Sequence, residues 1–311
     1  TFVIWRGRVG DAQLASKLPV VTMAGVGWAL LLAWLGQRSR PISAATSVLF
    51  LVSLLAWGRS TRPFVLSITR DPFAETIITT AEQVAPPPEQ QPTTLASLWG
   101  RDFWSLAYAQ EYQNRLPGLD LVDHNANFRA IVERGHRLLV LSRTFYVLPV
   151  SWWEERLGRL HLTSAAPGVI QLRLSPLTSA NGIPGDITFD LGNGLAIRSA
   201  RVTWNPGRDQ LYVTIYWETV HPTPEDYSVA VHLVSHDPPR DGADVLAQAD
   251  SIHPVEGWYP TSRWTAGEVV RDNYTLPVPP DSNPIAVRVA MYQIAADGSF
   301  SNTSWLSLPV P

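Results

Sequence analysis

The sequence predicts a membrane α-helical hairpin, followed by a small α/β domain with a parallel, Rossmann-like sheet and then by an antiparallel β-sandwich. Three observations lead to this prediction. Two uncharged apolar runs lie near the N-terminus, strand and helix patterns alternate through the middle, and short alternating runs punctuated by glycine and proline fill the remainder. We therefore divide the chain into a membrane region at residues 1–71, an α/β domain at 72–178 and a sandwich at 179–311.

The two apolar runs, residues 18–36 and 42–58, contain no charged side chain. Roughly 20 apolar residues cross the hydrocarbon core of a bilayer, so both runs approach the length of a transmembrane helix. Trp28, Trp34 and Trp57 stand where interfacial aromatic residues are expected. The alternative is a helical hairpin buried in the core of a water-soluble protein. Membrane lipid is therefore the first expected partner.

A hairpin places both of its flanks on the same side of the membrane. Basic residues occur in the connecting loop as well as in the flanks, so the positive-inside rule does not fix the orientation. The sequence begins with Thr1 rather than methionine, and we expect it to be part of a longer or trimmed polypeptide.

The region from residue 72 to residue 178 alternates between the two periodicities. Helices are expected at 72–84, 102–115, 125–134 and 151–157, and strands at 94–99, 119–123, 137–142, 160–163 and 169–174. Such alternation implies right-handed crossovers and a small parallel sheet. The sheet is too small for a full dinucleotide fold, and no glycine-rich phosphate motif follows any strand, so no cofactor is expected.

The sandwich is predicted from seven alternating runs separated by turn signals. They cover residues 187–191, 195–204, 210–218, 227–235, 245–250, 269–276 and 285–294. In the third run Leu211, Val213, Ile215 and Trp217 alternate with polar or aromatic residues, which assigns them to one face. The dipeptide Asp-Gly at 297–298 marks a hairpin near the C-terminus.

Composition narrows the class of protein. Of the 311 residues, 45% are hydrophobic and only 16% are charged. This hydrophobic content is enough to form buried cores, and the composition excludes a disordered chain. The formal net charge of −3 argues against a nucleic-acid partner. The absence of cysteine excludes disulfides and thiolate chemistry, including cysteine-based zinc sites.

A family resemblance rests on scaffold segments of both soluble domains. In the α/β domain these are Trp99, residues 104–123 (WSLAYAQEYQNRLPGLDLVD) and residues 134–141 (RGHRLLVL). In this region the chain resembles the C-terminal portion of multi-spanning bacterial membrane proteins related to protein O-mannosyltransferases, in the glycosyltransferase C superfamily. Residues 189–197, 211–218, 226–235 and 259–279 resemble a β-sandwich appended to such proteins in some thermophilic, filamentous phototrophic bacteria.

This resemblance implies a place in the inner membrane with the soluble domains on the extracytoplasmic side. The superfamily transfers sugar from a polyprenyl-phosphate donor to a glycan or protein acceptor, using a catalytic Asp in the first extracytoplasmic loop. Here Asp11 is the only acid before the apolar runs, and neither run contains a carboxylate. We therefore assign no catalytic residue, and any transferase chemistry would depend on residues outside this chain.

Ligands of parallel sheets bind beyond the carboxyl ends of the strands. The predicted ligand-binding residues at those ends are Trp99, Arg101, Asp102, Asp123, His124 and Arg143. Arginine can grip phosphate with two hydrogen bonds, aspartate can accept from sugar hydroxyls, and tryptophan offers a stacking face. The alternative is helix capping by Asp102 and Asn125 with solvated arginines.

The sandwich is rich in aromatic residues, which carbohydrate-binding proteins use to stack sugar rings. The glycan-stacking candidates are Tyr212, Tyr216, Trp258 and Trp264. The alternatives are packing within the core and contact with another protein. The four histidines of this domain have no metal-site spacing, and Asp237, Asp241 and Asp244 are more typical of a solvated turn than of a calcium loop, so no metal is expected.

The sequence thus favours a membrane-anchored module that positions a glycan or acceptor without carrying the catalytic acid. The rival interpretation is a non-catalytic accessory subunit, anchored by its hairpin among other membrane subunits and binding them through the sandwich. Small residues such as Gly25, Ala29 and Ala33 could pack against foreign helices. A secreted glycan hydrolase is a third class, for which no GxSxG motif or other positive signal occurs.

Overall fold

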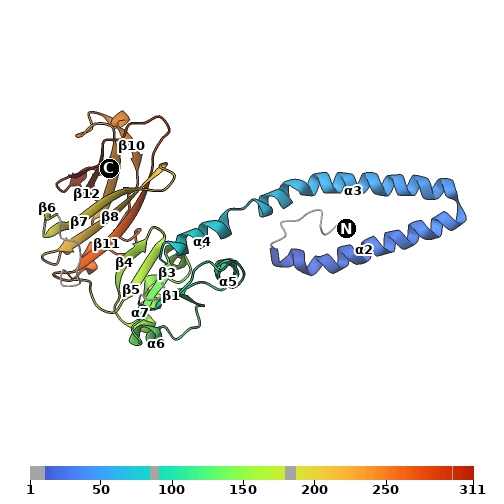
Figure 1. Cartoon of the computed structure of the whole chain (residues 1–311), viewed down its shortest axis with the longest axis horizontal. Coiled ribbons are helices and arrows are strands. Elements are labelled where there is room, and N and C mark those ends of the chain that lie inside the picture. Colours follow the sequence, from blue (N-terminus) through green and yellow to red (C-terminus); the bar gives the residue numbers. More distant parts are fainter. Residues whose placement is uncertain (1–10, 85–90, 179–186, 296) are drawn as a thin grey trace. The chain divides into compact units, whose positions relative to one another are not determined.

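A computed structural model describes residues 11–84, 91–178, 187–295 and 297–311 (Figure 1). The chain divides into two compact units, Thr1–Asp71 and Pro72–Pro311. The first contains the helical hairpin, and the second contains both the α/β domain and the sandwich. Each unit is described by itself.

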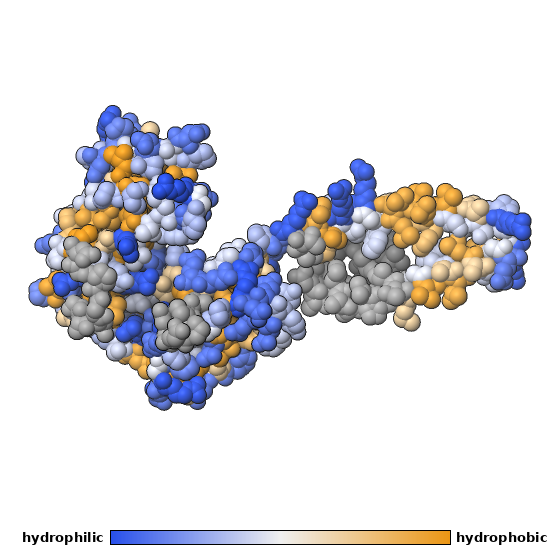
Figure 2. Space-filling view, viewed as in Figure 1, coloured by the Kyte–Doolittle hydropathy of each residue, from blue (hydrophilic) through white to orange (hydrophobic). Residues whose placement is uncertain are grey.

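Two long helices form the hairpin, α2 (Asp11–Arg38) and α3 (Arg40–Thr69). They pack against each other, and the ring of Trp28 on α2 stacks on Phe50 of α3 at 5.6 Å between centroids. Among the residues drawn in colour, apolar side chains cover much of the hairpin surface, while polar ones lie at its turn and along the C-terminal part of α3 (Figure 2). Leu49 and Leu55 are each about two-thirds exposed.

The structure supports only part of the predicted membrane region. In the described residues, Arg40–Leu66 is the one helix long and apolar enough to span a bilayer. The run at 18–36 lies within α2, but the side chains of residues 18–22 and 24 lie outside the described part. The helix predicted to end at residue 58 continues to Thr69 past Arg59 and Arg62. Once a helix has formed, each further residue adds a backbone hydrogen bond whether or not its side chain is apolar.

The α/β domain contains a mixed sheet rather than the predicted parallel one. Its strand order is β2-β1-β3-β5-β4. The strands are β1 (Thr93–Ala96), β2 (Leu119–Val122), β3 (Arg137–Leu141), β4 (His161–Ala166) and β5 (Val169–Arg173). The first three are parallel, as predicted, whereas β5 is antiparallel to both β3 and β4. Only Pro167 and Gly168 separate β4 from β5, which suffices for a hairpin but not for a parallel crossover.

Helices cover both faces of this sheet (Figure 1). They are α4 (Phe73–Glu82), α5 (Arg101–Gln113), α6 (Phe128–Glu133) and α7 (Val150–Leu157). Alternate residues of β3 point to opposite faces: Leu139 packs with Ile77 of α4 and Leu106 of α5, and Val140 belongs to the same cluster as Trp153 of α7. The predicted helix starting at residue 125 starts instead at Phe128, because Asn127 caps it by accepting from the Ala130 N–H.

The remaining strands form two antiparallel sheets, arranged as a sandwich. One sheet has the order β11-β8-β7-β6; in the other, β9 lies between β10 and β12, and both β13 and β14 pair with the far side of β12. The bounds are β6 (Phe189–Gly192), β7 (Leu195–Trp204), β8 (Gln210–Thr219), β9 (Ser228–Val234), β10 (Val245–Gln248), β11 (Val269–Pro277), β12 (Ala286–Ile294), β13 (Phe300–Asn302) and β14 (Leu306–Pro309).

All seven predicted strand runs appear, and the hairpin after β12 closes with an Ala295 N–H to Ser299 carbonyl bond of 2.9 Å. The core face of β8 is as predicted, with Leu211, Val213, Ile215 and Trp217 fully buried. This core continues into the α6–α7 side of the α/β domain as one hydrophobic cluster. The two domains therefore pack as one unit.

Candidate functional site

The carboxyl edge of β1 and β3 brings three of the predicted residues together. Arg143 lies in the short 3₁₀ helix after β3 (Ser142–Tyr146), and its Nε is 3.2 Å from Oδ2 of Asp102, near the start of α5. The guanidinium groups of Arg101 and Arg143 both lie over the Phe73 ring, at 3.7 and 4.4 Å from its centroid. Such stacking fixes both cations in place.

Asp102 does not cap α5, contrary to the capping alternative. Gly100 occupies the cap position with φ of 124°, and no side chain bonds to the helix end there. Asp102 is instead buried, and burial raises the pKa of its carboxyl despite the opposing effects of Arg143 and Arg101. Its contact with Arg143 holds that guanidinium in position. This edge therefore carries two cationic groups, Arg101 and Arg143, and a buried carboxyl group fixes the second.

The residues after β2 do not join this cluster. Asp123 accepts the backbone N–H of Asn125 at 2.9 Å, which makes it a turn-forming residue. His124 is half-buried beside it, and its Nδ1 has no hydrogen-bond partner within the described residues. No described contact joins either side chain to Asp102 or Arg143.

An exposed aromatic face on α5 was not predicted from the sequence. Trp104, Tyr108 and Tyr112 repeat every four residues and are all more than half exposed. The exposed Trp99 ring packs against Trp104 at 5.0 Å, and Tyr108 stacks on Tyr112 at 5.3 Å. The i, i+4 spacing opposite the buried Leu106 was the available signal, since a helix presents such residues on one face.

The four sandwich candidates divide by exposure. Trp264 is buried and its indole N–H donates to the Tyr259 carbonyl at 3.3 Å, so its selection as a glycan-stacking residue is wrong. Trp258 is half-buried and packs against Phe145 and Tyr146 of the α/β domain. Tyr212 and Tyr216 are half-buried on the face of β8 opposite to the core, where Thr214 between them donates to Asn273 of β11 at 2.7 Å.

The acidic turn that was considered for calcium is held by internal contacts. Asp241 accepts from the Ala243 N–H at 2.8 Å, and Asp244 contacts His236 at 2.7 Å. Asp237 lies 3.2 Å from Arg288. Each carboxylate is thus already engaged, and no group of three potential metal ligands occurs among the described residues.

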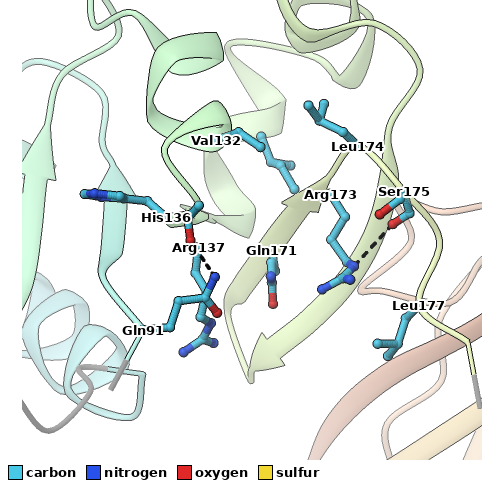
Figure 3. A pocket seen from close by; sticks show the side chains of 11 residues that line it. Gln91, Val132, His136, Arg137, Gln171, Arg173, Leu174, Ser175 and Leu177 are labelled. Atoms are coloured by element: carbon cyan, nitrogen blue, oxygen red, sulfur yellow. Dashed lines mark hydrogen bonds between the residues drawn. The ribbon is translucent and has the colours of Figure 1, made fainter. Parts of the chain in front are cut away.

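A pocket of about 460 Å³ opens at the opposite, amino edge of the mixed sheet (Figure 3). Its walls come from the segment before β1, the end of α6 and the start of β3, the end of β5, and the linker toward the sandwich. The lining residues are Gln91, Val132, Gly135, His136, Arg137, Gln171, Leu172, Arg173, Leu174, Ser175 and Leu177. The side chains of Arg137, Gln171 and Arg173 point to the same side (Figure 3).

Positive charge is concentrated at this pocket. Leu138 pairs with Leu172 between β3 and β5, so the next residues, Arg137 and Arg173, face each other across the ladder. Burial lowers the pKa of both guanidinium groups, and repulsion from Arg271 and Arg173 lowers that of Arg137 further. His136 contacts Thr94 Oγ1 at 3.1 Å and lies 3.5 Å from Asp120.

No protein-family model matches the sequence, and no curated protein shows significant similarity to it. The chemistry of the carboxyl edge and of the pocket therefore provides the evidence on function.

Proposed function

We propose that this chain is a membrane-anchored, extracytoplasmic module of a glycosyltransferase-like membrane protein, which positions a lipid-linked sugar, glycan or other acceptor without supplying the catalytic acid. The observation that carries the proposal is the apolar surface of α3. Side chains such as Leu49 and Leu55 are largely exposed along a helix of bilayer-spanning length. In water this surface would be unfavourable by about 25 cal/mol per Å², whereas lipid would cover it.

The chemistry of the carboxyl edge supports a binding role. Arg101 and Arg143 present two fixed cations of the kind that hold phosphate, and the neighbouring Trp99 ring is exposed. A polyprenyl-phosphate sugar carries both a phosphate and a sugar face. The outer face of β8, with Tyr212 and Tyr216, is the candidate surface for an acceptor glycan.

Positioning is favoured over catalysis because the buried acids are already engaged. Asp102 pairs with Arg143, and Asp272 accepts hydrogen bonds from Tyr274 and Trp217. Glu268 contacts His161 and accepts from Tyr259 and Thr265. Contacts that orient an acceptor accelerate transfer by a catalytic group elsewhere, because they remove the entropic cost of bringing reactants together.

The second candidate is an accessory subunit of a membrane complex. The aromatic face of α5 favours it, because exposed tryptophan and tyrosine dominate the binding energy of many protein interfaces. In this case Trp104, Tyr108 and Tyr112 would contact another subunit.

One experiment separates these interpretations. Membranes from the native source are washed with alkaline carbonate and solubilised, and the polypeptide is isolated for intact mass and subunit composition. A long polypeptide with further spans supports the transferase module, whereas a fixed ratio to other subunits supports the accessory role. Recovery in the aqueous fraction without detergent would contradict both.

A further inference from the structure

The pocket at the amino edge of the mixed sheet holds more positive charge than its surroundings neutralise. Arg137 and Arg173 are half-buried neighbours on β3 and β5, and Arg271 on β11 lies close enough to repel Arg137. In the described part of the chain, no carboxylate lies within 4.0 Å of any of these three guanidinium groups. The Nε of Arg271 is buried without a hydrogen-bond partner there.

The carboxylates nearest to the pocket, those of Glu268 and Asp120, already contact other residues. Glu268 acts on Arg173 electrostatically, but one of its oxygens contacts His161 Nδ1 and Tyr259 OH at 2.9 and 2.8 Å. Its other oxygen accepts from both the N–H and the hydroxyl of Thr265 at 2.9 Å. Asp120 faces His136 from an exposed position. Like charges directly opposite on neighbouring strands are destabilising, so a bound anion would stabilise the pair formed by Arg137 and Arg173.

We propose that the pocket lined by Arg137, Arg173 and Gln171 binds the oxyanion of a small polar ligand, a phosphate ester or a carboxylate of about sugar size. Two guanidinium groups match an oxyanion because each can donate paired N–H bonds. The Nε–H of Arg173 already donates to the Ser175 carbonyl at 3.3 Å, which leaves its two terminal amino groups as donors (Figure 3). The Gln171 amide supplies a donor and an acceptor for hydroxyl groups, and Leu177 adds apolar surface, whereas Val132 and Leu174 line the pocket away from the arginine side chains (Figure 3). The volume of about 460 Å³ lies within the range of small-molecule sites.

The pocket is independent of the proposed membrane function. The pocket lies entirely within the Pro72–Pro311 unit, so it requires neither lipid nor the resemblance to transferases. It also lies at the edge opposite to Arg101 and Arg143, and the two cationic sites are formed by different residues.

The test is calorimetric titration of the full chain, in a non-ionic detergent without a sugar head group, with inorganic phosphate, glucose 1-phosphate and glucuronate. We expect saturable binding of at least one anion, weakened by sodium chloride. Preference for glucose 1-phosphate identifies a phosphate ester, and preference for glucuronate identifies a carboxylate. Absence of saturable binding for all three would overturn the proposal.

Variants distinguish the pocket from general surface charge. We expect Arg137→Gln and Arg173→Gln each to weaken binding at least tenfold, and Arg137→Lys to weaken it as well, because lysine keeps the charge but loses the fork. Arg240→Gln, at an exposed sandwich loop, is the matched control and should bind as the parent does. Equal binding by parent and Arg137→Gln would contradict the assignment.

Thermal unfolding without ligand provides a second readout. If Arg137 serves a ligand, its neutralisation relieves repulsion, so Arg137→Gln should melt at the same temperature as the parent or higher. A purely structural Arg137 would instead give a lower melting temperature with unchanged anion affinity in the folded fraction, and that pair of results would refute the proposal.

Discussion

Asp272 illustrates how a single buried carboxyl shapes the sandwich core. It is fully buried on β11, where it accepts from the Tyr274 hydroxyl at 2.5 Å and from the Trp217 indole at 3.3 Å. Burial outweighs these hydrogen bonds and raises the pKa of Asp272 to about 6. The folded protein therefore holds this proton more tightly than the unfolded chain does.

From this shift we predict a pH dependence of stability. Because the folded-state pKa lies above the ordinary value of 3.8, the contribution of Asp272 to stability falls as pH rises from about 4 to about 6 and is level above that. The change amounts to about 3 kcal/mol at most. Asp272→Asn should remove this component, measured by urea unfolding at pH 4 and pH 7.

The matched control is Asp281→Asn, the same chemical change at an exposed turn. Burial also raises the pKa of Glu256, so Asp272→Asn retains some slope of the same sign, and the test is whether that slope is smaller than in the parent. An identical pH dependence in Asp272→Asn and the parent would show that Asp272 does not titrate in this range.

A second residue-scale prediction concerns the buried contact between the two soluble domains. The Tyr259 hydroxyl donates to Glu268 at 2.8 Å and lies 3.2 Å from His161 Nδ1 on β4. Tyr259→Phe should lower the free energy of unfolding by about 1–2 kcal/mol, because it removes a buried hydrogen bond to a charged group. Chemical denaturation measures this change. Tyr212→Phe, at a half-buried tyrosine, should shift stability by less than about 0.5 kcal/mol, and equal losses would contradict the account.

The alternation of apolar and other residues predicted the buried face of β8, because this pattern depends only on neighbours in the sequence. Prediction from the sequence failed at Asp102, where a helix-capping pattern was present but the helix cap lies two residues earlier, at Gly100. Trp264 failed for a related reason: a tryptophan suits both a sugar platform and a core, and only the fold decides its exposure.

At the scale of elements, the β4–β5 hairpin makes the sheet mixed. Gly168 turns the chain with φ of 80°, and a Cβ added there would lie 3.1 Å from Cγ2 of Thr80 on α4. Its N–H also donates to Glu256 at 2.5 Å. Gly168→Ala should therefore destabilise the protein by about 1 kcal/mol or more, because alanine is strained at positive φ and meets α4.

Urea unfolding again supplies the measurement. Gly242→Ala is the control, since a Cβ at Gly242 meets nothing within 4 Å and its φ lies outside the left-handed region. Were Gly168→Ala as stable as the parent, the turn would have to differ from the one described.

The sequence predicted which segments are helices and which are strands, but it predicted the direction of only some of the strands. The alternation of strands and helices correctly gave three parallel strands, but it was extended to β4 and β5, where the short Pro167–Gly168 connection points to a hairpin. The amino-edge pocket could not be predicted from the sequence, because Gln91, Arg137 and Arg173 come from separated segments that only the fold brings together.

For the whole molecule, anchoring in the membrane depends on α3 crossing lipid. The chain contains no cysteine, so a single introduced thiol reports its own surroundings. Leu55→Cys lies on the exposed surface of α3, and Ile252→Cys lies on the exposed surface of the sandwich. N-ethylmaleimide crosses membranes but reacts only where water allows thiolate to form, so membrane orientation does not matter.

Labelling of these two variants in intact membranes, before and after addition of SDS, tests whether α3 crosses lipid. We predict that both proteins sediment with the membranes, that Ile252→Cys reacts at once, and that Leu55→Cys reacts only after SDS is added. Leu55→Cys reacting as fast as Ile252→Cys, or a chain that remains in the supernatant without detergent, would contradict a membrane-anchored module.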